Sequence, residues 1–191
     1  KGLNNSLHVK GYAYDPEKAI ELIQKFKQSH HNKTPELTLS PDASYVDMCT
    51  YLQHAYEKVG VKINIEVLPP AALRQAKTNG KVSLFRASWV ADYPDPENYL
   101  LPFFSDNFTP NGPNYTHFYN TQFDIEYNEM IQTTDIELRN QKLTRLDQLL
   151  VEEAPFVVLY YDEALRFVQP NVKGMHINPL MMLDLRRVYK K

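Results

Sequence analysis

The chain has 191 residues, of which 43% are hydrophobic and 23% are charged, and its formal net charge at pH 7 is −2. This length fits one domain or one large lobe with a substantial core. The near-neutral charge and the dispersed basic residues give no electrostatic reason to expect nucleic acid or an anionic membrane as a partner. No apolar run approaches the roughly 20 residues that span a bilayer, and no signal segment is recognisable at the N-terminus.

The first half of the chain predicts alternating helices and strands. Asp15 is a good N-cap, Pro16 suits the first helical position, and apolar residues recur at helical spacing up to Phe26. The elements expected next are a strand over 36–40, a helix over 42–59 closed by a glycine at 60, a strand over 61–67, a short helix ending at 78 and a strand over 82–90. This alternation predicts an α/β fold with a mostly parallel sheet flanked by helices.

The second half predicts mainly helices. The expected elements are a short helix over 97–104 interrupted by a proline at 102, a loop over 105–117, helices over 121–133 and 135–153, a fully apolar strand over 156–161 and a weaker strand over 165–168. No internal repeat, low-complexity tract or linker divides the sequence, so residues 1–191 are interpreted as one domain.

The stretch over 82–95 is the candidate ligand wall. It begins as an apolar strand and carries the only tryptophan, Trp89, into an acidic turn punctuated by Pro94 and Pro96. In mostly parallel sheets, ligands bind beyond the carboxyl ends of the strands, which is where this turn falls. The alternative interpretation, a core strand that ends in a solvated loop, remains open from local chemistry alone.

Motifs for catalysis, cofactors and metals are missing from the sequence. The six glycines form no phosphate-binding loop, the six histidines have no zinc-site spacing, and no serine lies in a Gly-x-Ser-x-Gly elbow. Cys49, the only cysteine, lies on the apolar face of a predicted helix, where a reactive thiolate is disfavoured. Asp92 and Asp95 lie three residues apart in a turn that contains prolines, which is more typical of a solvated loop than of a pair of glycosidase carboxylates. We therefore predict a binding protein without catalytic residues, cofactor or metal, and without nucleic acid as a partner.

Several stretches, in the correct order, resemble motifs of the family 5 extracellular solute-binding proteins, the peptide and nickel class that serves ABC importers. The most specific is Trp89-Val-Ala-Asp-Tyr-Pro-Asp-Pro96. The other matching stretches are residues 14–19, 51–62, 123–124, 139, 149–155, 171–174 and 178–179. The resemblance implies a lobe like those of type II periplasmic binding proteins. It also implies that residues 1–191 are the C-terminal, ligand-binding lobe of a larger receptor whose N-terminal lobe is absent here.

The resemblance assigns roles to five residues. Asp92 would pair with the α-ammonium of a peptide, and the main chain near Ser88 and Val90 would pair with the peptide backbone. Trp89 would contribute to side-chain pockets, and Arg86 would approach the peptide carboxylate.

Two features of this stretch complicate the assignment. Arg86 and Trp89 have opposite parity, so both reach a ligand only if the strand twists or bulges near Ala87. Ser88 stands where the family usually has a glycine, which obstructs the site only if a positive φ is required there.

The function that follows from the resemblance is non-enzymatic binding of short peptides for an ABC import system. The implied partners are a short peptide, the transporter permease and the N-terminal lobe of the same protein. The implied location is the periplasm or, as a lipoprotein, the cell surface, and the abrupt start of the chain agrees with removal of a secretion signal. Two alternatives stay open: a receptor of the same fold for nickel chelate, haem or oligosaccharide, or the ligand-sensing module of a regulator.

Overall fold

The structure is a computed structural model that describes residues 9–163, 165–176 and 182–191. Its helices are α1 (Pro16–Ser29), α2 (Val46–Lys58), α3 (Pro70–Thr78), α4 (Thr121–Gln132) and α5 (Ile136–Glu153). Its strands are β1 (Glu36–Ser40), β2 (Lys62–Ile65), β3 (Leu84–Phe85), β4 (Val172–Lys173) and β5 (Tyr189–Lys190). Short 3-10 turns are η1 (Ala43–Tyr45), η2 (Pro96–Tyr99), η3 (Leu101–Phe103) and η4 (Ser105–Asn107). In the described residues, no helix is long and apolar enough to cross a membrane.

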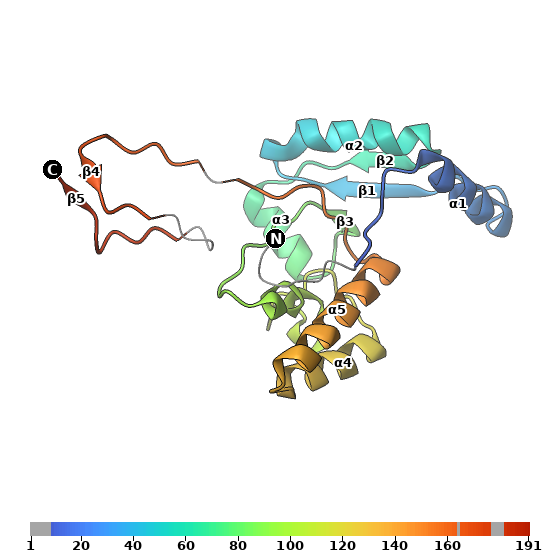
Figure 1. The fold of residues 1–191 in the computed structure, drawn as a ribbon. Coiled ribbons are helices and arrows are strands. Elements are labelled where there is room, and N and C mark those ends of the chain that lie inside the picture. Colours follow the sequence, from blue (N-terminus) through green and yellow to red (C-terminus); the bar gives the residue numbers. More distant parts are fainter. Residues whose placement is uncertain (1–8, 164, 177–181) are drawn as a thin grey trace.

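A three-stranded parallel sheet forms the first half of the fold, with strand order β2-β1-β3. Figure 1 shows α2 on one side of this sheet and α3 on the other. The core between α2 and the sheet contains four buried residues, Leu39, Cys49, Val61 and Ile63. The predicted α/β class with a mostly parallel sheet flanked by helices is therefore confirmed.

The predicted helix ends of the first half agree with the capping contacts. The Asp15 carboxylate accepts a 2.9 Å hydrogen bond from the Lys18 main-chain N–H, and Pro16 begins α1. Gly60 follows the end of α2 with a φ of +90°, a conformation that costs glycine little and strains other residues. The helix expected over 42–59 is split, because its first turn is the 3-10 turn η1.

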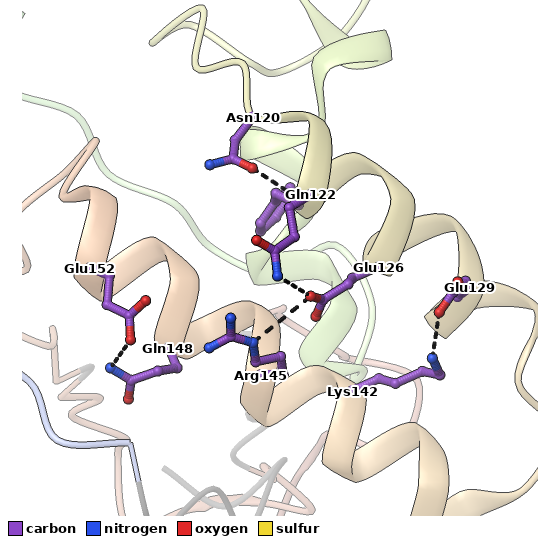
Figure 2. A network of polar contacts seen from close by, with 9 residues as sticks. Asn120, Gln122, Glu126, Glu129, Lys142, Arg145, Gln148 and Glu152 are labelled. Atoms are coloured by element: carbon purple, nitrogen blue, oxygen red, sulfur yellow. Dashed lines mark hydrogen bonds and ion pairs between the residues drawn. The ribbon is translucent and has the colours of Figure 1, made fainter.

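A second core lies between α4, α5 and the η3 region. It contains the aromatic residues Phe103, Phe104, Phe123 and Tyr127, together with leucines of α5. Across the outside of this helix pair, Lys142 binds Glu129 at 2.7 Å and Arg145 lies 3.8 Å from Glu126 (Figure 2). Such exposed pairs contribute little to stability, so the buried face holds the two helices together.

Four predicted elements differ from the structure. The strand expected over 82–90 is limited to Leu84–Phe85, because the chain leaves the sheet after it pairs with β1 at Ser40. The strands expected over 156–161 and 165–168 do not form: these residues are extended or irregular and make no strand pairing. The helix expected over 97–104 is instead the two 3-10 turns η2 and η3.

The exposure of the side chains over 156–161 explains why the strand predicted there was wrong. A fully apolar run is typical of a strand buried on both faces, but Val157 is 66% exposed and Tyr161 is 80% exposed. Phe156 stacks on Phe103 with a 4.6 Å centroid distance, and the Tyr160 hydroxyl accepts a 3.5 Å hydrogen bond from Arg86, so the segment contacts the body without pairing as a strand. The segment then continues away from the body towards the antiparallel pair β4–β5, which was not predicted (Figure 1).

Candidate ligand-binding site

The main chain after β3 is extended and has no strand partner. β3 pairs with β1 through Leu84 and Phe85, and the strand assignment ends there. Among the described residues, no backbone–backbone hydrogen bond outside helices and strands begins or ends at residues 86–92. Val90 is 55% exposed, and Ser88 is also exposed. Apart from the Asp92 N–H, which Asn98 binds, the main-chain groups of this stretch have no backbone partner among the described residues, so those that face solvent bind water or a ligand.

Asn98 holds the far end of this stretch in place. It lies in η2, and its side chain is fully buried. Its Oδ1 accepts a 2.9 Å hydrogen bond from Trp89 Nε1 and a 3.1 Å hydrogen bond from the main-chain N–H of Asp92. One amide oxygen therefore fixes both the half-buried indole and the main chain at Asp92.

The carboxylate of Asp92 is exposed to solvent. Within the part of the chain that the structure describes, no hydrogen bond or ion pair engages this carboxylate. Only the Asp92 main chain is held, through Asn98. An exposed carboxylate without a partner among the described residues, on a main chain held in place, is suited to receive an ammonium group.

A buried carboxylate lies below the turn. Glu97 is 8% exposed and accepts short hydrogen bonds from the hydroxyls of Tyr93 and Tyr127. Burial and the bond to Glu97 raise the pKa of Tyr127 strongly, so this hydroxyl stays protonated as a donor. The bond to Glu97 and burial also raise the pKa of Tyr93, against a lowering effect of Asn98. These contacts tie the turn to α4, which carries Tyr127.

Asp95 ties the same turn to α5. Its carboxylate accepts a 2.8 Å hydrogen bond from the Glu97 main-chain N–H and a 2.9 Å hydrogen bond from Arg139. Burial alone would raise the pKa of Asp95, but the bonds from Arg139 and the Glu97 N–H outweigh it and leave this pKa below its ordinary value. Asp95 is therefore a structural carboxylate, which separates its role from that of Asp92.

Arg86 lies in a cluster of aromatic and polar groups. Its guanidinium carbon is 3.7 Å from the centroid of the Tyr45 ring. Arg86 also donates long hydrogen bonds to Ser88 Oγ at 3.4 Å and to the Tyr160 hydroxyl at 3.5 Å. Among the described residues, no carboxylate forms an ion pair with Arg86. Its charge is stacked on an aromatic face and remains available to an anion.

The predicted site residues thus fall into two groups. Trp89 and Asp92 are joined through Asn98, and Arg86 is joined to Ser88. Val90 lies between Trp89 and Asp92 in the sequence, and its side chain is exposed.

The sequence interpretation missed Asn98 and Tyr45. The only sequence signal for Asn98 was its position two residues after the Pro94-Asp95-Pro96 turn. Tyr45 lies 41 residues from Arg86, and nothing in the sequence connects the two.

The described residues contain no group of three histidine, cysteine, aspartate or glutamate side chains that could hold a metal ion. Burial raises the pKa of the Cys49 thiol, which disfavours a reactive thiolate. Two surface hollows, of about 270 and 550 Å³, are lined by residues around α1 and β2 and by residues of α3. The stretch over 86–92 lines neither of these two hollows.

The fold is that of the type II periplasmic binding proteins. The family model described as bacterial extracellular solute-binding proteins, family 5 Middle, matches residues 2–111, more than half of the chain. The chain belongs to this family.

Individual relatives match nearly the whole chain. A probable di/tripeptide-binding protein 5 of Pseudomonas aeruginosa is 26% identical over 190 residues, which cover 96% of this chain and 35% of the relative. Heme-binding protein A of Haemophilus influenzae is 26% identical over 90% of this chain and 32% of its own. The solved dipeptide-binding protein of Pseudoalteromonas sp. SM9913 in complex with Met-Leu is 25% identical, with a TM-score of 0.73 over 93% of this chain and 36% of its own. The chain thus spans about a third of the length of these relatives.

Proposed function

We propose that this chain is the ligand-binding lobe of a solute-binding receptor for an ABC import system, and that the receptor binds short peptides in a cleft between two lobes. The observation that carries this proposal is the main chain over 86–92, which is exposed at Ser88 and Val90, has no strand partner among the described residues and ends at the exposed Asp92 carboxylate, which has no partner among them either. The relatives named for dipeptides and tripeptides, and the Met-Leu complex, support the choice of peptide as ligand.

In this proposal the peptide adds to the open main chain in the manner of an extra strand. The N–H and C=O groups near Ser88 and Val90 pair with the peptide backbone. Asp92 pairs with the α-ammonium, Trp89 lines a side-chain pocket, and Arg86 approaches the α-carboxylate. Asp92, Arg86 and the main chain between them thus match the three parts of a short zwitterionic peptide, which are its ammonium, its carboxylate and its backbone.

This mode of binding reads the peptide backbone and its termini, which every peptide shares. It therefore gives affinity without strict side-chain selection. Residues 1–191 supply one wall, and the N-terminal lobe of the same protein supplies the other, so closure of the two lobes buries the ligand. On its own this chain should bind peptides weakly or not at all.

The further partners follow from the same proposal. The loaded receptor delivers the peptide to the permease of the transporter and performs no chemistry on it. A receptor of this kind acts in the periplasm or, as a lipoprotein, at the cell surface. The names of the relatives, which are binding proteins, support the non-enzymatic role.

Haem is the second candidate ligand, because a relative of equal identity is a heme-binding protein. The same wall would then meet a large planar ligand whose propionate groups seek cations. Arg86, stacked on Tyr45, is the cation that this wall offers. The unpaired carboxylate of Asp92 favours the peptide, because it would repel the propionates.

The experiment that tests the proposal uses the full-length receptor. Native mass spectrometry identifies any co-purified ligand, and isothermal titration compares a dipeptide with its N-acetylated form and with haem. We expect dipeptide binding that N-acetylation weakens strongly, since it removes the ammonium. Equal affinity for both peptide forms, or binding of haem alone, would overturn the peptide proposal.

A further inference from the structure

Asn98 is a buried side chain with two hydrogen bonds to the candidate site, and the resemblance assigned it no role. Its Oδ1 receives the Trp89 indole N–H at 2.9 Å and the Asp92 main-chain N–H at 3.1 Å. Both donors belong to residues that the proposed function places against the ligand. A single acceptor with two donors fixes the separation of the indole and the Asp92 main chain, because neither can move without stretching one bond.

The other half of the Asn98 amide argues against a role in packing alone. Its Nδ2 is buried and, among the described residues, makes no hydrogen bond of normal geometry, although the amide interacts with the Tyr93 hydroxyl closely enough to lower the pKa of Tyr93. A buried donor without a well-formed bond is unfavourable. The well-formed hydrogen bonds of this amide are those of Oδ1, and both of them go to the ligand wall.

Asn114 offers a contrast within the same fold. It is also fully buried. Its Nδ2 donates to the main-chain carbonyls of Phe104 and Phe118, and its Oδ1 accepts from the Thr116 hydroxyl. All of these contacts stay within the loop over 104–118, and none reaches residues 86–92. Asn114 is thus a buried asparagine that stabilises a loop, with each half of its amide in use.

We propose that Asn98 is a positioning residue that sets the distance between the Trp89 indole and the Asp92 main chain, and thereby the place from which the Asp92 carboxylate recognises the ligand ammonium. This inference rests on the proposed function for its effect on affinity. The contacts with Trp89 and Asp92 do not depend on it.

Because Asn98 acts through other residues, its effect differs from that of a general loss of stability. A destabilised receptor binds the dipeptide and its N-acetylated form less well by the same factor. Loss of the positioning residue instead leaves the Asp92 carboxylate free to turn away, so it weakens ammonium recognition selectively. The ratio of the two dissociation constants separates the two cases.

The test compares Asn98→Ala with Asn114→Ala in the full-length receptor. We expect Asn98→Ala to reduce the preference for the free dipeptide over its N-acetylated form by about tenfold, the effect of losing one to two hydrogen bonds. Asn114→Ala should lower the melting temperature and leave this preference within about twofold, because its hydrogen bonds lie outside the wall. An unchanged preference in Asn98→Ala, or an equal loss in Asn114→Ala, would refute the positioning role.

A second measurement works without any ligand. The indole resonance of Trp89 in ¹⁵N–¹H spectra is assigned as the one that Trp89→Phe removes. In the unmodified receptor we expect slowed exchange of this N–H with water, and in Asn98→Ala a shifted resonance with faster exchange. Asn98→Ser, whose hydroxyl is too short to reach both donors, serves if the alanine variant does not fold. Rapid exchange in the unmodified receptor, or an indole resonance that Asn98→Ala leaves in place, would refute the inference.

The two measurements also separate this inference from the proposed function. A receptor that binds no peptide would refute the peptide proposal, while the indole resonance still decides whether Asn98 holds the wall. A receptor that discriminates between the free and acetylated peptides, with an Asn98→Ala variant that does so equally well, would leave the peptide proposal standing and remove Asn98 from it.

Discussion

The guanidinium carbon of Arg86 lies 3.7 Å from the centroid of the Tyr45 ring, which connects the end of β3 with the turn before α2. A planar guanidinium stacked on an aromatic face loses little further freedom when it binds a carboxylate, because its plane is already set. Tyr45 therefore belongs with Arg86 as part of the candidate site, although the sequence separates them by 41 residues.

Arg86→Lys tests this pair. Lysine keeps the charge but loses the stacking and the bidentate geometry, so we expect peptides with a free carboxylate to bind about tenfold more weakly. Peptides with an amidated C-terminus should be affected little. Isothermal titration of the full-length receptor with both forms measures the difference. Arg74→Lys, on the exposed surface of α3, is the matched control, and an equal effect of both variants would contradict the role of Arg86.

Asp92→Asn tests the ammonium contact. The substitution keeps the size of the side chain and the main-chain bond to Asn98 but removes the charge. We expect a loss of about 2–5 kcal/mol in binding a free dipeptide, the range for a charge pair that becomes buried when ligand binds. Titration measures the loss. Asp106→Asn changes another exposed aspartate, which lies on η4, and it should leave the affinity unchanged. An Asp92→Asn receptor with full affinity would remove Asp92 from the site.

The sequence predicted best the features that depend on neighbouring residues. The start of α1 follows from Asp15 and Pro16, because the cap contact joins residues three apart. The strand prediction over 156–161 was wrong because it also rested on neighbouring residues alone. The composition of this segment reports how much apolar surface it carries, and the position of any partner for that surface depends on the whole fold.

The candidate site shows the same division. The stretch carrying Trp89 and Asp92 could be found from its motif, but β3 ends at Phe85 instead of continuing to 90. No regular strand runs from Arg86 to Trp89, so the expectation that their side chains point to opposite faces of a strand no longer applies. Asn98 could not be found, because its two bonds depend on how the turn over 92–97 folds back.

The pair between Asp95 and Arg139 should make stability depend on acid pH. The pKa of Asp95 is depressed in the folded state, because the bonds from Arg139 and the Glu97 N–H outweigh the effect of burial. Its contribution is therefore present above its unfolded pKa of roughly 3.8 and is lost as pH falls through the lower, folded value.

Arg139→Gln tests this linkage. We expect a loss of roughly 1 kcal/mol in the free energy of unfolding at pH 7, and a shallower decline of stability below about pH 4. Urea denaturation at a series of pH values measures both. Arg145→Gln removes an arginine that lies 3.8 Å from Glu126 on the exposed side of α5, and it should change neither. An unaltered acid profile in Arg139→Gln would show that the pair does not control the pKa of Asp95.

The buried carboxylate of Glu97 provides the sharpest test of how the turn is anchored. Glu97 accepts hydrogen bonds from Tyr93 and Tyr127, and Tyr127 is almost fully buried in the second core. Tyr127→Phe removes one donor from a buried charge, so we expect a loss of about 1.5–3 kcal/mol in the free energy of unfolding. Tyr119→Phe, which changes an exposed tyrosine at the start of α4, should cost far less. Urea denaturation of both variants measures the difference, and equal stability of the two would show that Tyr127 contributes to this core only through its ring.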